Sequence, residues 1–142
     1  MPPALEELRR RYDDVAGRGL PWLVAESGGA VAGYGYCAPY RSRSAYRYAL
    51  EDSVYVRQDA QGKGLGSALL RELIARCEAL GYRQMIAVIG DSANLASINL
   101  HARLGFLRAG LLRASGFKLG RWVDSVLMQR PLGPGDGSTP EK

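Results

Sequence analysis

Three glycines at alternate positions, Gly62, Gly64 and Gly66, lie in the stretch DAQGKGLGSALLREL at residues 59–73. Glycine loses more backbone entropy on folding than any other residue, so this cluster at the start of a helical pattern needs a compensating gain. The first backbone amides of a helix have no partner within the helix and carry partial positive charge. Glycines let a bulky anion approach those amides, so the stretch predicts a phosphate or pyrophosphate site with Lys63 nearby.

Two common phosphate-binding patterns do not fit this stretch. The dinucleotide fingerprint needs a third glycine where the chain has Ser67, and an acidic residue about 20 positions on, whereas Asp91 lies beyond that place. The phosphate loop of nucleotide hydrolases needs Gly-Lys-Ser/Thr at a distance from the first glycine that the chain does not provide. What remains is Gln61-x-x-Gly64-x-Gly66 between a strand and a helix, which fits either a phosphate site or a plain tight turn.

Composition limits the class of protein. The 142 residues suit one domain, and no apolar run approaches the length of a membrane span. The first residues lack the apolar core of a secretory signal, and Cys37 and Cys77 lack metal-ligand spacing, so we expect a cytoplasmic protein without a metal or a membrane partner. The net charge of +5 suits an anionic partner or a solvated surface. Basic residues do not alternate with exposed aromatic residues in any stretch, which argues against nucleic acid.

Hydrophobic periodicity places the glycine stretch within an α/β sandwich on a mixed sheet. The expected order is a helix, three strands, a second helix that ends at Gly81, a strand, a third helix and two strands. The first helix covers residues 4–15, the third covers residues 94–105, and the strands cover residues 22–26, 30–39, 45–56, 85–90, 106–113 and 121–129. Residues 1–132 form one domain, and the polar, Gly- and Pro-rich residues 133–142 are expected to be disordered.

A second segment, NLASINLHARLGF at residues 94–106, follows the second helix after one strand and one loop. Together with VYVRQDAQGKGLGSALL, it resembles the two cofactor motifs of the GNAT superfamily of acetyl-CoA-dependent N-acetyltransferases. In that superfamily the Gln-x-x-Gly-x-Gly turn is the pyrophosphate site, and the second motif has a tyrosine where this chain has His101. The resemblance implies a mixed, mostly antiparallel sheet that is splayed at the acetyl-CoA site and flanked by helices.

A narrower resemblance rests on SVYV, SINLHARLGF and GFKLGRWVDSVLMQ. These segments are similar to the phosphinothricin and methionine sulfoximine N-acetyltransferases, small enzymes that acetylate the α-amine of amino-acid analogues, and the match covers about residues 5–132. Members of this subfamily begin with a further strand and helix, so the resemblance implies an N-terminally shortened fold. We expect the sheet edge near residues 22–26 to be exposed and to favour a homodimer.

The resemblance also implies which residues hold acetyl-CoA. The pantetheine arm is expected along the backbone of Val54, Tyr55 and Val56, as if it added a strand to the sheet. Asn94 and Ser97 are expected to reach the same arm from the third helix. The pyrophosphate is expected at the loop that comprises Gln61, Gly62, Lys63, Gly64, Leu65, Gly66 and Ser67.

Candidate catalytic residues are fewer. An α-amine is mostly protonated at neutral pH, so the reaction needs a general base, and Glu51 is the candidate; the alternative is a solvent-facing charge at a strand edge. His101 replaces the usual tyrosine near the thiolate, and is expected to act as the leaving-group acid, as an orienting residue or as a purely structural histidine. Neither cysteine is placed for a covalent acetyl intermediate, so direct attack of the amine on the thioester is expected.

The acceptor is expected to contact basic residues. Arg41, Ser42 and Arg43 precede the catalytic strand, and arginine binds a carboxylate through two hydrogen bonds, although these residues also suit a plain surface loop. Lys118 belongs to the C-terminal signature of the subfamily, with Phe117, Arg121, Trp122 and Asp124 as pocket wall or dimer contact. The expected function is acetylation of a small amino-acid-like amine. The alternatives are an acetyltransferase for protein N-termini, which needs an open acidic groove, and a non-catalytic acetyl-CoA-binding domain.

Overall fold

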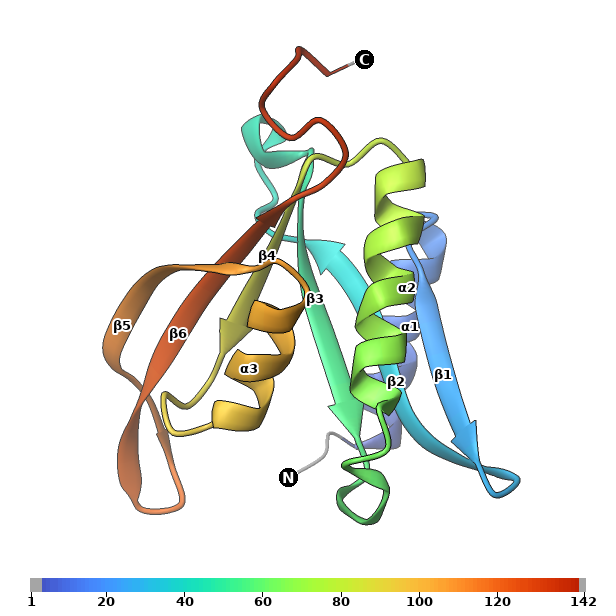
Figure 1. The fold of residues 1–142 in the computed structure, drawn as a ribbon, viewed down its shortest axis with the longest axis vertical. Helices are drawn as coiled ribbons and strands as arrows, with labels where there is room; N and C mark the ends of the chain where they lie inside the picture. The colour runs from blue at the N-terminus through green and yellow to red at the C-terminus, as the bar shows by residue number, and fades with distance from the viewer. Residues whose placement is uncertain (1–3, 141–142) are drawn as a thin grey trace.

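The computed structural model describes residues 4–140, in which three α-helices flank a six-stranded sheet (Figure 1). The helices are α1 (Leu5–Gly17), α2 (Leu65–Ala79) and α3 (Leu95–Arg103). The strands are β1 (Trp22–Ser27), β2 (Ala30–Pro39), β3 (Ala49–Val56), β4 (Gln84–Ile89), β5 (Leu107–Lys118) and β6 (Arg121–Pro131). Their order in the sheet is β1-β2-β3-β4-β6-β5, and every neighbouring pair is antiparallel except β3 with β4. The mixed, mostly antiparallel sheet expected from the sequence is confirmed.

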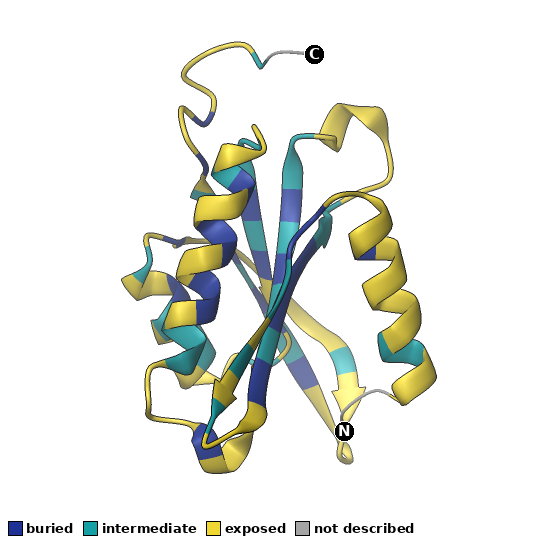
Figure 2. Cartoon of the chain, turned by 90° about the vertical axis from the view of Figure 1, so that its right-hand side faces the viewer, coloured by how far each residue is buried: buried dark blue, intermediate teal, exposed yellow. Residues whose placement is uncertain are grey.

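Helices cover both faces of the sheet. α1 lies on one face, and α2 and α3 lie on the other, as Figure 2 shows with the sheet between them. The apolar residues predicted at helical spacing in α2 are buried, among them Leu70, Leu73 and Cys77. They form the core with apolar residues of β2, β3, β4 and β6. No helix within residues 4–140 combines the length and the apolar character needed to span a membrane.

Neighbouring strands β3 and β4 separate along their length. They pair only where residues 49–51 lie beside residues 84–86, and they then diverge, with α3 beside the opening in Figure 1. From Asp52 to Val56, the edge of β3 that faces β4 therefore has no strand partner within the described chain. The opening expected in the middle of the sheet is thus present, and it leaves backbone groups of β3 available.

Two strand boundaries differ from the sequence-based expectation by more than two residues. Residues 44–46 form a short 3-10 turn, so β3 begins at Ala49 rather than at residue 45, because Tyr46 is exposed and residues 44–46 pair with no strand of the described chain. β5 continues to Lys118 rather than ending at residue 113, because a bulge absorbs the irregular segment. In that bulge Ala114 has a φ of 49°, and its N–H donates to Asp124 Oδ1 at 2.8 Å.

The C-terminal segment forms hydrogen bonds with residues near the start of β4 and the end of α2. Disorder is predicted for residues 133–142, of which the structure describes residues 133–140. Arg83 donates hydrogen bonds to the carbonyls of Gly135, at 2.8 Å, and Ser138, at 2.9 Å. Glu78 accepts from the N–H of Gly133 at 2.7 Å. Composition does not reveal these contacts because the partners lie about fifty residues earlier in the chain. The disorder of the segment stays a prediction, and residues 141 and 142 lie outside the described part.

Candidate functional site

A cavity of about 620 Å³ lies beside the unpaired edge of β3, between the start of α2 and α3. Eleven of the twelve residues expected to bind the cofactor line it: Val54, Tyr55, Val56, Gln61, Gly62, Gly64, Leu65, Gly66, Ser67, Asn94 and Ser97. Lys63 is the exception. The sequence did not single out five further lining residues, namely Ala60, Ala96, Asn99, Leu100 and Arg103. The two sequence motifs therefore meet around one cavity.

The loop before α2 is shaped by its glycines. Gly64 is the residue before the helix and has a φ of 79°, a left-handed conformation that favours glycine, and a Cβ added there would meet open space. The side chain of Gln61 donates to the Val56 carbonyl at 3.3 Å and ties the loop to the end of β3. No side chain of the described chain caps the start of α2. The first amides of α2 are therefore available to an anion in the cavity.

The start of α3 is capped by its own side chain. Asn94 Oδ1 accepts a hydrogen bond from the N–H of Ser97 at 3.2 Å, which fixes the end of the helix that borders the cavity. The middle of α3 packs against the first turn of α2, since a Cβ on Gly66 would lie 3.4 Å from Leu100. The two helices thus form adjoining walls of the cavity.

A buried ion pair joins β3 to α3. His101 Nε2 lies 2.8 Å from Asp52 Oδ1, and His101 Nδ1 lies 2.8 Å from the carbonyl oxygen of Ser97. A carbonyl oxygen can only accept, so Nδ1 carries a proton, and the carboxylate favours a second proton on Nε2. Burial lowers the pKa of His101, but the hydrogen bond and charge of Asp52 and the Ser97 carbonyl outweigh it, so the pKa is raised above its usual value.

This geometry favours the structural alternative for His101. Both ring nitrogens are engaged, so neither is free to protonate a leaving thiolate. The contact of Asp52 with His101 was not predicted, because the sequence gives no sign that Asp52 meets a side chain 49 positions away. Its second carboxylate oxygen, Oδ2, is buried and has no hydrogen-bond partner within residues 4–140.

Glu51 lies on the opposite face of the sheet from His101. Successive side chains of a strand point to opposite faces, and Asp52 points to α3, so Glu51 points to the face on which α1 lies. Its side chain is half-buried. Burial and the charge of Asp52 raise the pKa of Glu51, while Arg41 lowers it. A raised pKa makes a carboxylate a better proton acceptor, which suits a general base.

The residues expected to bind the acceptor do not gather at one place. Pro39 pairs with Leu50, so the loop that carries Arg41, Ser42 and Arg43 lies at the N-terminal end of β3, where Arg41 is near enough to affect Glu51. Lys118 instead affects the pKa of Asp91, which follows the C-terminal end of β4. Because β3 and β4 are parallel, these are opposite ends of the sheet. Within one chain, Lys118 therefore lies at the other end of the sheet from the loop that carries Arg41 and Arg43.

Neither cysteine has the properties of a nucleophile. Cys37 and Cys77 are both buried, on β2 and α2. The hydrogen bond with Cys77, burial and the charge of Asp52 all raise the pKa of the Cys37 thiol. A thiol held protonated in this way does not attack a thioester, which agrees with the direct attack expected from the sequence.

Comparisons with known proteins agree with this cavity. Residues 2–106 match the model of the acetyltransferase (GNAT) family. The chain is 56% identical over 141 residues to phosphinothricin N-acetyltransferase of Alcaligenes faecalis, a match that spans 99% of this chain and 72% of that protein. It is 44% identical over 134 residues to the L-methionine sulfoximine/L-methionine sulfone acetyltransferase of Pseudomonas aeruginosa, spanning 94% and 77% of the two chains.

The fold is also similar to that of a solved structure. A GNAT superfamily phosphinothricin acetyltransferase from Sinorhizobium meliloti, crystallised in complex with AcCoA, superposes with a TM-score of 0.95 at 51% sequence identity. The superposition covers 100% of this chain and 77% of that chain.

Proposed function

The chain belongs to the acetyltransferase (GNAT) family, and from this we propose that it transfers the acetyl group of acetyl-CoA to the amine of a small amino-acid-like acceptor. One observation carries the proposal. The unpaired edge of β3 forms the inner wall of a cavity whose outer end holds the uncapped start of α2. An extended arm and a diphosphate are the two features of coenzyme A that this arrangement suits.

The coenzyme is proposed to bind as an added strand. Its pantetheine amides pair with the free backbone of residues 54–56, and its diphosphate rests on the first amides of α2. A backbone N–H of β3 then donates to the acetyl carbonyl and stabilises the negative charge that develops on that oxygen during attack. Asn94 and Ser97 border the pantetheine from α3.

The acceptor is proposed to approach from the other face of the sheet, where Glu51 lies. Glu51 removes a proton from the ammonium group, directly or through a water molecule, and the free amine attacks the carbonyl carbon of the thioester. The C–N bond forms, the C–S bond breaks, and coenzyme A leaves as a thiolate. The second proton that the nitrogen loses as the amide forms passes to this thiolate through solvent. The two substrates thus meet at the opening between β3 and β4.

An amino-acid-like acceptor is supported by the relatives and by Arg41. The relatives reported above are named for phosphinothricin and for methionine sulfoximine and sulfone. Arg41 is exposed, lies near Glu51, and can bind an acceptor carboxylate through its planar guanidinium group. A protein N-terminus is the less favoured acceptor, because its recognition needs an acidic groove rather than an arginine loop. A cytoplasmic location stays a prediction.

The function is tested by following release of free thiol from acetyl-CoA with a panel of acceptors. We expect turnover with α-amino acids or their phosphinic and sulfoximine analogues, and none with their carboxyl methyl esters, which lack the free carboxylate. Turnover confined to peptides would favour the acetyltransferase for protein N-termini. Coenzyme binding without turnover on any amine would favour the non-catalytic alternative.

Gly64→Val is expected to abolish measurable binding of acetyl-CoA in calorimetry. A Cβ there has no other atom of the described chain within 4 Å, so the side chain starts into open space at the mouth of the cavity, where the diphosphate is proposed to lie. The positive φ of Gly64 also makes the substitution strained. Gly81→Val is the matched control, since Gly81 also has a positive φ and open space around it but lies beyond the other end of α2. If the two variants bound acetyl-CoA equally well, the diphosphate would not bind at this loop.

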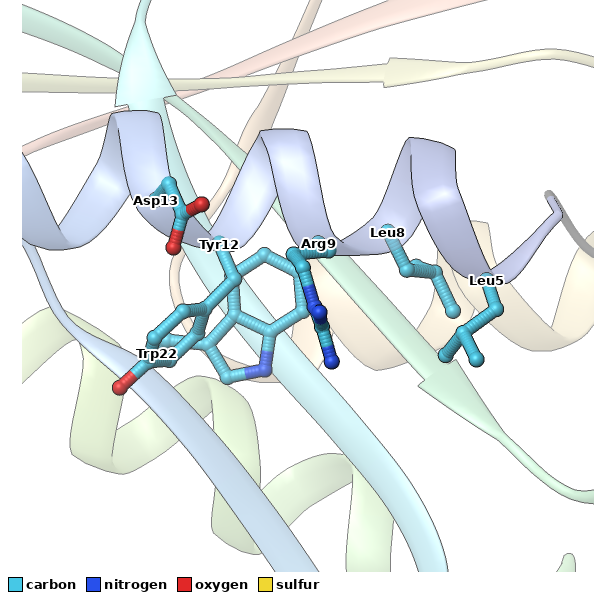
Figure 3. A pocket seen from close by; sticks show the side chains of 6 residues that line it. All are labelled: Leu5, Leu8, Arg9, Tyr12, Asp13 and Trp22. Atoms are coloured by element: carbon cyan, nitrogen blue, oxygen red, sulfur yellow. The ribbon is translucent and has the colours of Figure 1, made fainter.

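The proposal includes a homodimer that forms through β1. This strand pairs only with β2 within the described chain, so one edge carries unpaired backbone groups, and Val24 is exposed along it. Beside it, Leu5, Leu8, Arg9, Tyr12, Asp13 and Trp22 line an open depression of about 380 Å³ between α1 and β1 (Figure 3). Exposed apolar side chains next to an open strand edge favour association with a second copy.

Light scattering tests the dimer. We expect the mass of two chains for the parent protein and of one chain for Val24→Lys, because a charge on an edge strand opposes pairing. Leu111→Lys is the control, since Leu111 is exposed on β5, the strand at the opposite edge of the sheet. A parent protein that is monomeric, or a Leu111→Lys variant that alone dissociates, would contradict pairing through β1.

A further inference from the structure

The lining of the cavity carries one charged side chain within residues 4–140, that of Arg103. Lys63, the cation that the sequence placed near the phosphates, does not line the cavity. Arg103 forms no hydrogen bond or ion pair with any residue of the described chain, whereas Arg57, Arg76 and Arg121 are each paired with a carboxylate. All the donors of its guanidinium group are therefore available to a ligand.

Arg103 lies on a different part of the cavity wall from the uncapped start of α2. It is the last residue of α3, and it shares one stripe of that helix with Ala96 and Asn99, which also line the cavity. Leu100, one turn before Arg103, contacts the first turn of α2. The cation therefore lies about one helical turn beyond the point where the two helices meet.

The C-terminal end of a helix carries partial negative charge, which repels a phosphate. Arg103 occupies this end of α3 and offsets that charge. A wall of the cavity that would otherwise oppose an anion is thereby made attractive to one. The cavity thus has two separate features that favour anions, the amides of α2 and the guanidinium of Arg103.

Coenzyme A carries two separate anionic groups at its nucleotide end. One is the diphosphate, and the other is a phosphomonoester on the 3′-hydroxyl of the ribose, which carries nearly two negative charges at pH 7. We propose that Arg103 binds this 3′-phosphate through paired hydrogen bonds, so that the site distinguishes the phosphorylated coenzyme from its dephospho form. The inference rests on the proposed function, since it takes the diphosphate to lie at the start of α2.

The test compares acetyl-CoA with 3′-dephospho-acetyl-CoA by calorimetry. The parent protein is expected to bind acetyl-CoA at least about tenfold more tightly than the dephospho form, as one charge-assisted pair of hydrogen bonds implies. For Arg103→Gln, the dissociation constants of the two forms are expected to lie within about threefold of each other. The affinity for acetyl-CoA is expected to fall, and the affinity for the dephospho form is expected to stay the same. Arg71→Gln is the matched control, because it removes the same charge from an exposed position on α2 outside the cavity, and it is expected to keep the preference.

Two results would overturn the inference while leaving the proposed function in place. The first is a parent protein that binds both coenzymes equally. The second is an Arg103→Gln variant that weakens both by the same factor, which would place Arg103 at the diphosphate. If the parent protein bound neither coenzyme, the proposed function itself would be wrong and the inference would fall with it. The thermal midpoint of Arg103→Gln without ligand is expected to lie at or slightly below that of the parent protein, because the side chain has no hydrogen-bond partner within residues 4–140 and only its interaction with the end of α3 is lost.

Discussion

Glu51→Gln is expected to lower kcat by roughly 10²–10⁴-fold, with the dissociation constant of acetyl-CoA almost unchanged. The amide keeps the shape of the side chain but cannot accept a proton from the acceptor ammonium. Glu51 lies outside the residues that line the coenzyme cavity, which is why coenzyme binding is expected to survive. Steady-state thiol release measures the first effect, and calorimetry measures the second.

The dependence on pH makes this prediction more specific. Activity of Glu51→Gln is expected to recover partly as pH rises, because more of the acceptor amine is then unprotonated without help. Glu26→Gln, which neutralises an exposed carboxylate on β1, is the control and is expected to behave like the parent protein. Near-normal turnover of Glu51→Gln at neutral pH would show that Glu51 is not the general base and would favour the alternative of a solvent-facing charge at a strand edge.

Arg41→Gln provides a second test of Glu51 as the general base. Arg41 lowers the pKa of Glu51, so its removal raises that pKa further. A base must be deprotonated to act, and the acid limb of the kcat/KM profile is therefore expected to move to higher pH in Arg41→Gln. If the acid limb of the profile did not move, the ionisation that produces it would not be that of Glu51.

Asp52→Ala is expected to lower the free energy of unfolding by about 3–5 kcal/mol, the usual cost of removing one partner of a buried ion pair. The change leaves the His101 imidazolium buried without its counter-charge, in a position where both side chains are almost fully enclosed. Asp52→Asn is expected to cost less, because an amide N–H can donate to the Nε2 of a neutral His101. Urea unfolding followed by circular dichroism measures both changes.

The sign of the pH dependence follows from the pKa of His101, which is raised in the folded protein. Such a group contributes its full stabilisation below the unfolded pKa of about 6.5, and this contribution is lost as pH rises through the folded pKa. The stability advantage of the parent protein over Asp52→Asn is therefore expected to shrink as pH is raised above about 6.5. Asp13→Asn, on the exposed side of α1, serves as the control. An advantage of constant size across this range would show that the pair is not ionised.

Local patterns in the sequence determined the coenzyme half of the site. The glycine loop, the apolar repeat of α2 and the Asn94 cap each depend on residues within a few positions of one another, because φ angles, helical spacing and caps are local properties. Eleven of the twelve expected coenzyme-binding residues consequently line one cavity. Arg103 belongs to the same motif but carried no signal of its own, since an arginine in the last turn of a helix also suits plain solvent.

Tertiary structure alone determined where the candidate catalytic and acceptor-binding residues lie. Glu51 and His101 are the two catalytic candidates from the sequence, and they lie on opposite faces of the sheet. A short segment of sequence does not say which face of a strand is covered by which helix. The pairing of Asp52 with His101, and that of Arg83 with the C-terminal segment, join residues about fifty positions apart. Contacts of that kind are set by how strands and helices pack, and this packing also separates Lys118 from Arg41 at opposite ends of two parallel strands.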